Sequence, residues 1–278
     1  MKKIILPTDF SENAYNAIRY ALQLFRDEEC TFYLVNTYTP AVYQAEYVLH
    51  SPGQIGLGDL YQSNSMELLE DVKAKLLENF SNPKHTIITH AAFNMVADEV
   101  KDMVEKEGAD LVVMGTQGAT GAKEILFGTH TVHVIKQVHC PVIVVPSGFE
   151  YEIPKEILFP TDYEVAYDEL RLPVLLDIAK LHRSSVEVIH ISAGYELSDV
   201  QEKNRKKLGK LLAKTSHVFH DLPSQEIITA INTFQQKTQV NFLVMVRNKH
   251  TFLERLFIEP VVKKIAFHVT IPFMVIPA

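Results

Sequence analysis

An internal repeat is the feature that most constrains the fold of this 278-residue chain. Three segments of the first half recur in the same order in the second half. They pair 4–9 (IILPTD) with 157–162 (ILFPTD), 109–114 (ADLVVM) with 240–245 (VNFLVM), and 140–146 (CPVIVVP) with 271–277 (IPFMVIP). Such ordered self-similarity indicates a duplicated domain. Because prolines and a glycine punctuate the chain between the copies, we place the two domains at 1–147 and 154–278.

Within each copy, short apolar runs alternate with segments that have apolar residues at helical spacing. Strands are predicted in the first copy at 3–7, 31–37, 85–90, 110–115 and 141–146, and in the second near 156–160, 185–191, 216–220, 241–246 and 272–277. Helices are predicted in the first copy at 12–28, 63–80, 94–107 and 129–138. Strands that are apolar throughout and alternate with helices predict an α/β fold with a parallel sheet covered on both faces.

One connection of the first copy is unusually long. Residues 39–62 follow the second predicted strand and contain Tyr, Pro and Gly, whereas the second copy has only a few residues at this place. Loops of this length more often form lids or binding surfaces than plain connections. We therefore expect 39–62 to be a lid or a binding surface.

Charge and cysteine content exclude several function classes. The net charge is −7, with 11 basic and 18 acidic residues up to position 148 and 16 of each thereafter. Neither half has the positive excess of a nucleic-acid binder, so nucleic acid is not an expected partner. Cys30 and Cys140 lack the spacing of a redox or metal motif and are predicted to be small buried hydrophobic residues.

Membrane and targeting signals are weak in this sequence. No apolar run approaches the ~18 residues that cross a bilayer. The apolar stretch near the start is only five residues long before Thr8 and Asp9, shorter than the core of a signal peptide. We expect a cytoplasmic protein without a membrane partner.

Glycines concentrate after the fourth predicted strand. Four of the chain's 11 glycines lie between positions 115 and 130. Glycine lets backbone N–H groups approach phosphate oxygens, and Gly128-Thr129 opens a predicted helix whose N-terminus favours an anion. Two interpretations remain open: a phosphate-binding loop, or an ordinary strand-to-helix loop in which Thr129 serves only as the N-cap.

The glycine spacing G-x2-G-x9-G-[ST] is filled by Gly115, Gly118, Gly128 and Thr129. Together with the Pro-Thr-Asp turn at 7–9 and the strand at 140–145, it resembles the ATP-binding branch of the universal stress protein family, here in a tandem arrangement. The resemblance covers essentially the whole chain. In that family, the aspartate after strand one and a backbone contact from strand two hold adenosine. The glycine loop and the Ser/Thr hold ribose and phosphates, often with Mg²⁺.

Carried over by position, the resemblance implies a site for ATP or AMP in the first domain. Adenosine would contact Asp9 and Val35, although Leu34 or Asn36 could take the place of Val35. Ribose and phosphates would contact Gly115, Gly118, Gly128 and Thr129. We add four neighbours to the predicted site, with His130 as a hydrogen-bond donor near the phosphates: Pro7, Thr8, Met114 and His130.

The second copy serves as an internal comparison. It keeps the Pro-Thr-Asp turn at 160–162, but its segment 246–260 contains no glycine and ends in Glu259-Pro260. An acidic side chain repels an anion and proline lacks an N–H donor, so the second domain is predicted to be a degenerate copy that binds no nucleotide. Because Asp162 persists without the glycine loop, Asp9 could equally be a helix cap or a turn former.

The resemblance also implies the detailed architecture. We expect two flavodoxin-like, or Rossmann-like, domains, each with a five-stranded parallel sheet in the order 3-2-1-4-5. The family pairs two such domains through their fifth strands. Val142–Val145 and Phe273–Ile276 would form that pair within one chain, an intramolecular pseudo-dimer, and a further homodimer remains open.

The functional expectation is a stress-response protein that binds ATP or AMP and acts as a nucleotide-dependent sensor or regulator of an unidentified protein partner. An interaction protein or scaffold without nucleotide is the first alternative. A slow ATP hydrolase or self-phosphorylating protein is the second, because Thr116, Thr120 and Thr129 lie near the predicted phosphates. No catalytic motif such as G-x-S-x-G or H-E-x-x-H occurs, so an enzymatic role is undecided.

Overall fold

The structure is a computed structural model, and two compact α/β units make up the chain. The described residues up to Cys140 form the first unit, and those from Pro141 onward form the second. Strand pairing is mainly parallel in both units, which confirms the α/β class predicted from the sequence. The described residues are 1–38, 57–116, 128–167, 172–192, 194, 196–223, 227–247 and 270–277.

The described residues of the first unit form four parallel strands in the spatial order β3-β2-β1-β4. Strand β1 lies between β2 and β4, so the strand order reverses beside it. The side chains of Ile4, Ile5, Val112 and Val113 are fully buried, as expected for strands covered on both faces. The strands are β1 (Lys2–Pro7), β2 (Cys30–Thr37), β3 (His85–Ala92) and β4 (Leu111–Gly115).

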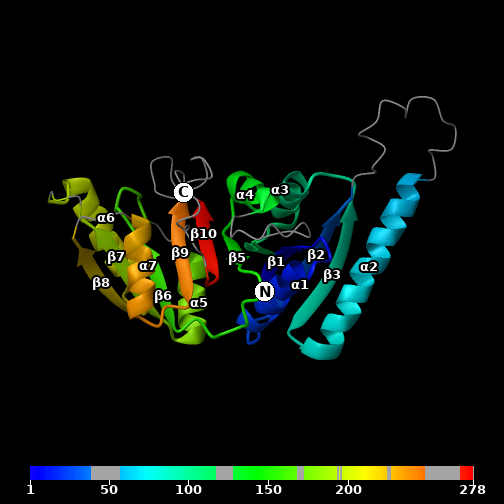
Figure 1. The fold of residues 1–278 in the computed structure, drawn as a ribbon, viewed down its shortest axis with the longest axis horizontal. Helices are drawn as coiled ribbons and strands as arrows, with labels where there is room; N and C mark the ends of the chain where they lie inside the picture. Colours follow the sequence, from blue (N-terminus) through cyan, green and yellow to red (C-terminus); the bar gives the residue numbers. More distant parts are fainter. Residues whose placement is uncertain are drawn as a thin grey trace, which may run out of the picture. The chain divides into compact units, whose positions relative to one another are not determined.

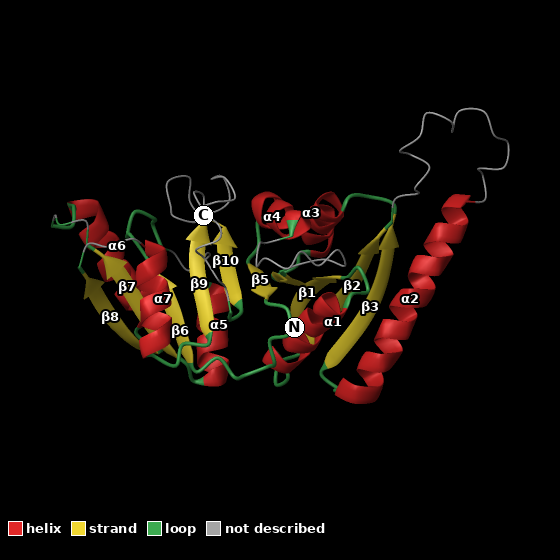
Figure 2. Cartoon of the chain, in the orientation of Figure 1, coloured by secondary structure: helices red, strands yellow, loops and turns green. Residues whose placement is uncertain are grey.

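Helices cover both faces of this sheet (Figures 1 and 2). Helices α1 and α2 share one face, where the Arg19 guanidinium lies 5.8 Å from the centre of the Phe80 ring. Helices α3 and α4 contact each other on the opposite face. The helices are α1 (Glu12–Leu24), α2 (Leu57–Phe80), α3 (Val96–Glu107) and α4 (Thr129–Gln137).

Helix α2 begins earlier than the sequence pattern predicts. The expected connection ran through residue 62, but the helix already begins at Leu57. Leu60, in its first turns, is 64% exposed and adds nothing to the buried apolar stripe from which a helix is recognised in a sequence. Residues 39–56 lie outside the described part of the chain, and their role as a lid or binding surface stays a prediction.

In the described part of the second unit, six strands lie in the spatial order β5-β10-β9-β6-β7-β8. Its last five strands repeat the order 3-2-1-4-5 expected for the second copy. The strands are β5 (Val142–Val145), β6 (Glu156–Pro160), β7 (Ser185–Ile191), β8 (Ser216–Leu222), β9 (Phe242–Arg247) and β10 (Phe273–Pro277). The helices are α5 (Pro173–His182), α6 (Asp199–Leu212) and α7 (Ile227–Lys237).

Strands β5 and β10 form the antiparallel pair expected between the two fifth strands. Val144 lies opposite Phe273, Ile143 opposite Met274, and Val142 opposite Val275. This pairing places β5 in the same compact unit as β10. The domain boundaries at 147 and 154 stay predictions.

Both cysteines are buried, as the sequence suggested: Cys30 is 1% and Cys140 is 7% exposed. Burial raises the pKa of each thiol from 9.0 to about 12. A shift of this size lowers the thiolate fraction at pH 8 by about a thousandfold. The folded protein should therefore react very slowly with a thiol-specific disulfide reagent at pH 8, whereas both thiols should react at once in denaturant. Fast labelling of either cysteine in the folded protein would contradict the burial described here.

Candidate functional site

The turn after β1 is fixed by the backbone of Thr8. Its N–H donates to the carbonyl oxygen of Val35 at 2.8 Å, and its carbonyl accepts from the Asn36 amide at 2.8 Å. The Thr8 hydroxyl oxygen accepts from the N–H of Phe10 at 3.0 Å. Phe10 has a φ of 65°, a left-handed conformation uncommon for a residue with a side chain, so local hydrogen bonds hold an uncommon turn.

Asp9 acts in this turn through the residue that caps α1. Its Oδ1 accepts hydrogen bonds from the N–H of Ser11 at 3.1 Å and from the Ser11 hydroxyl at 2.6 Å. Ser11 is the N-cap, and its hydroxyl oxygen accepts from the N–H of Ala14. Asp9 is therefore a turn former that orients the cap, while the predicted contact of Asp9 with adenosine stays a prediction.

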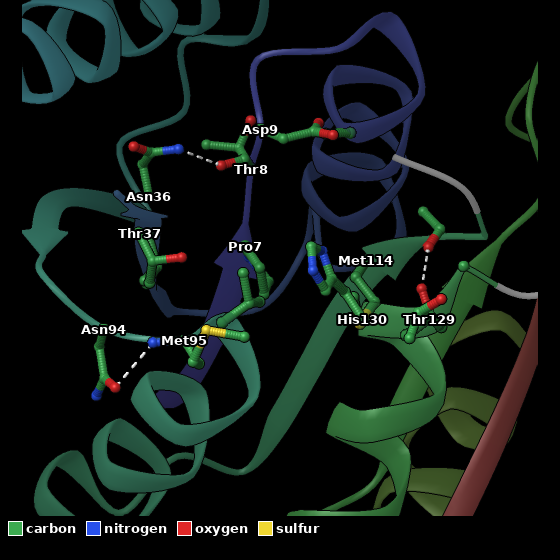
Figure 3. A pocket seen from close by; sticks show the side chains of 16 residues that line it. Pro7, Thr8, Asp9, Asn36, Thr37, Asn94, Met95, Met114, Thr129 and His130 are labelled. Atoms are coloured by element: carbon green, nitrogen blue, oxygen red, sulfur yellow. Dashed lines mark hydrogen bonds between the residues drawn. The ribbon is translucent and has the colours of Figure 1, made fainter. Parts of the chain in front are cut away.

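A pocket of about 480 Å³ opens at the carboxyl ends of β1, β2 and β4, beside the N-termini of α3 and α4 (Figure 3). This is the edge of a doubly wound sheet where ligands bind, next to the strand at which the order reverses. In the close-up view, Asn36 and Thr37 lie across the pocket from Thr129 and His130. The volume falls within the range of small-molecule sites.

Nine of the ten predicted site residues line this one pocket. They are Pro7, Thr8, Asp9, Val35, Met114, Gly115, Gly128, Thr129 and His130. The tenth, Gly118, lies outside the described residues. Residues more than 100 positions apart in the sequence are thus brought together by the fold, although their contact with a ligand stays a prediction.

Further lining residues come from β2 and from the start of α3. Asn36, an alternative to Val35 in the sequence analysis, lines the pocket together with Val35, whereas Leu34 is fully buried. The missed residues Asn94–Val96 follow β3. Considering the carboxyl end of the third strand alongside those of the first, second and fourth would have included them.

Asn36 connects the pocket to helix α2. Its side chain is 8% exposed, donates to the Thr8 carbonyl and accepts from the Ser65 hydroxyl at 2.7 Å. Ser65 is itself 3% exposed on α2. Because buried polar groups are costly without partners, this pair fixes the amide that forms one wall of the pocket.

A second chain of hydrogen bonds supports the wall at Asn94 and Met95. The Asn94 amide donates to Glu99 at 2.9 Å, and Asn94 Oδ1 accepts from the N–H of Met95 at 2.8 Å. His90 Nε2 lies 2.7 Å from the other carboxylate oxygen of Glu99. Burial by itself raises the pKa of Glu99, but the hydrogen bonds from Asn94 and His90 outweigh it and the net pKa is lowered. Glu99 thus holds the loop between β3 and α3 as a carboxylate.

The N-terminus of α4 faces the pocket. Gly128 is the N-cap and has no side chain to cap the helix, so the interpretation of Thr129 as a mere N-cap is wrong: Thr129 is the first helical residue. The Thr131 hydroxyl donates to the carbonyl of Gly115 at 3.0 Å and ties the helix to the end of β4. The first N–H groups of a helix lack intrahelical acceptors, and the helix dipole favours an anion at this end.

The described part of the chain contains neither a metal-binding cluster nor a membrane-spanning helix. Its residues contain no group of three or more His, Cys, Asp or Glu side chains arranged to hold a metal ion. Nor does any described helix have both the length and the apolar character needed to cross a membrane.

Gly115 lies where α1 packs closely on β4. A Cβ atom at this position would lie 2.6 Å from Nδ2 and 3.2 Å from the backbone oxygen of Asn13. We expect Gly115→Ala to lower the free energy of unfolding by about 1–3 kcal/mol, as overpacking does. Urea denaturation measures the change.

The matched control is Gly209→Ala in helix α6, where a Cβ atom would come no closer than 3.8 Å to Phe219. There, the higher helix propensity of alanine should raise the free energy of unfolding by up to about 1 kcal/mol. Equal effects of the two substitutions would contradict the close contact at Gly115.

Comparisons with known proteins identify the family of this chain. Residues 1–146 match the Universal stress protein family. Universal stress protein MJ0531 of Methanocaldococcus jannaschii is 33% identical over 153 residues, covering 52% of this chain and 81% of that protein. Universal stress protein MJ0577 of the same organism is 32% identical over 160 residues, covering 52% of this chain and 94% of that protein.

A solved structure has the same fold. It is the crystal structure of a universal stress protein from Archaeoglobus fulgidus DSM 4304, with a TM-score of 0.64 and 17% identity over 98% of this chain and 95% of that one. The chain therefore belongs to the universal stress protein family.

Proposed function

We propose that the first unit binds an adenine nucleotide, ATP or AMP, in the pocket at the ends of β1, β2 and β4. One observation supports the proposal most directly: the residues predicted from the glycine spacing and the Pro-Thr-Asp turn line one pocket of about 480 Å³. Family membership alone would not support nucleotide binding, since one fold hosts many functions. The pocket combines apolar walls, a helix N-terminus and a few polar groups, which suits a ligand with both an aromatic base and phosphates.

The phosphates are proposed to lie at the N-terminus of α4. Helix N–H groups without intrahelical acceptors and the helix dipole favour an anion at this end, and the N-cap Gly128 carries no side chain. The Thr129 hydroxyl and the His130 ring add hydrogen-bonding groups from side chains that line the pocket. Gly118, outside the described residues, belongs to the same proposed phosphate contact.

The nucleoside is proposed to lie toward β1 and β2. Asp9 and Val35 line this part of the pocket, and the Asn36 amide is held there by its two hydrogen bonds. Met95 and Met114 add polarisable sulfur atoms, which make favourable contacts with aromatic rings. Pro7 and Thr8 complete the wall formed by β1.

Any Mg²⁺ would be held mainly by the nucleotide itself. Asp9 is the only carboxylate among the described lining residues. Mg²⁺ in nucleotide sites is commonly bound by one or two carboxylates together with substrate phosphates and water. The residues present therefore fit a metal that arrives with ATP better than a site built for metal alone.

We further propose that the chain is a tandem member of the family and a nucleotide-dependent regulator, with the second unit as a copy that binds no nucleotide. The sequence of the second copy lacks glycine at 246–260. That segment lies outside the described residues from position 248 onward, so the sequence carries this part of the proposal. We also expect, from the sequence alone, a protein partner and a cytoplasmic location, and a further homodimer remains open.

The first test is to purify the chain without added ligand, denature it and identify any released nucleotide by chromatography. We expect ATP, ADP or AMP at close to one per chain, or binding of one Mg-ATP per chain when it is added. Two per chain would show that the second unit also binds. No nucleotide in either experiment would favour the interaction protein.

A pair of histidine variants tests the proposed position of the phosphates. His130 lines the pocket, whereas His133 lies on the same helix, is exposed and does not line it. We expect His130→Ala to weaken ATP binding severalfold in isothermal titration calorimetry, consistent with loss of one hydrogen bond, and to leave adenosine binding nearly unchanged. His133→Ala should retain the affinity of the unsubstituted chain for both ligands.

Equal affinities of the two variants for ATP would contradict the placement of the phosphates at α4. Phosphate release that scales with protein concentration and disappears in Thr129→Ala would support the hydrolase alternative. The two measurements together distinguish a binding protein from an enzyme.

A further inference from the structure

The internal repeat allows the two units to be compared residue by residue at the end of their first strands. Matching 4–9 with 157–162 puts Thr161 in the place of Thr8. The same count pairs Tyr167 with Ala14, but Ala14 lies in the first turn of α1, whereas Tyr167 precedes α5, which begins at Pro173. The second strands of the two copies, β2 and β7, can be matched by the residue that accepts a hydrogen bond from each of these threonines. Thr8 N–H donates to Val35 at 2.8 Å, and Thr161 N–H donates to Ile189 at 2.9 Å.

The second unit keeps the backbone geometry of the turn. Tyr163 has a φ of 58°, and its N–H donates to the Thr161 hydroxyl oxygen at 2.9 Å, as Phe10 does to Thr8. His190 follows Ile189, as Asn36 follows Val35. Its Nδ1 lies 3.0 Å from the Thr161 carbonyl oxygen, which matches the contact of Asn36 with Thr8. The framework around the pocket of the first unit therefore has a counterpart here.

The two units differ in the side chain that faces this framework. Ala14 lines the open pocket of the first unit. Tyr167 is 2% exposed, its hydroxyl is hydrogen-bonded to the Thr161 hydroxyl, and its ring contacts that of Phe159 edge-on at 5.9 Å between centres. Thr8, the counterpart of Thr161, lines the pocket of the first unit. The tyrosine is thus hydrogen-bonded to a residue whose counterpart lines an open pocket.

We propose that Tyr167 closes the second unit's counterpart of the pocket by placing an aromatic ring of the chain itself in the volume that the first unit keeps open. Burial raises the pKa of the Tyr167 phenol, so the ring is held in its neutral form as an apolar occupant with one hydrogen bond. Tyr167 determines which unit accepts a ligand, in addition to the loss of glycines. The nature of the ligand in the first unit rests on the proposed function, but the closure by Tyr167 does not.

Removal of the ring should open a cavity that takes a small aromatic molecule in its place. Cavities left by truncation of large buried side chains bind small aromatic molecules of the removed shape. We expect Tyr167→Ala to melt at a lower temperature than the unsubstituted chain and to regain stability on titration with phenol, with saturation at one phenol per chain. Tyr167→Phe keeps the ring and is the matched control, which phenol should not stabilise.

A folded Tyr167→Ala chain that phenol stabilises no more than Tyr167→Phe would overturn the proposal. The reciprocal substitution covers the case in which Tyr167→Ala does not fold. Ala14→Tyr places the same ring at a residue that lines the pocket of the first unit and should lower adenosine and ATP affinity at least tenfold, whereas Ala14→Ser should retain it. Unchanged affinity of a folded Ala14→Tyr chain would count against closure by this position. If the unsubstituted chain binds no nucleotide, the proposed function fails, and the phenol titration alone decides the role of Tyr167.

Discussion

The hydrogen bonds at the end of β1 are the constraint on which the site depends. The Thr8 N–H is hydrogen-bonded to Val35 and the Thr8 carbonyl to the next residue of β2, Asn36. These two bonds fix the direction in which the chain leaves the sheet. That direction sets the left-handed residue Phe10, the cap at Ser11 and the start of α1, and the pocket lies beside it at the carboxyl ends of β1 and β4. Thr161 makes the matching bonds with β7. Two sequences that have diverged elsewhere thus share one turn because few other arrangements satisfy the same backbone groups.

Gly115 shows that packing accounts for part of the glycine pattern. The residue lies where α1 crosses β4, and its missing side chain makes room for Asn13. Its carbonyl also accepts from Thr131 and so fixes the beginning of α4. The same glycine therefore brings two helices close to the pocket before any ligand is considered. Phosphate binding and backbone geometry are compatible explanations for this residue, and the close approach of α1 would retain it in either case.

The strands were predictable because buried parallel strands are continuous apolar runs. The predicted run at 3–7 lies in β1, and the run predicted at 110–115 contains β4, whose five residues are all buried. The beginning of α2 was not predictable, since Leu60 is exposed and gives no helical pattern of burial. Within the site, motif residues were found from their spacing. Asn94 and Met95 were missed because their place in the pocket follows from α3 packing beside the sheet, and the contact between Tyr167 and Thr161 belongs to the folded chain alone.

The antiparallel pairing of β5 with β10 has a thermodynamic consequence for a protein that contains both strands in one chain. Strands on separate molecules associate only as far as their concentration allows. Strands joined by a chain meet at an effective concentration that the connecting chain sets and that does not change with the amount of protein. Assembly of β5 with β10 is therefore independent of how much protein is present, and dilution does not separate the two strands. The edges that face each other are occupied within the molecule and are not offered to strands of other chains.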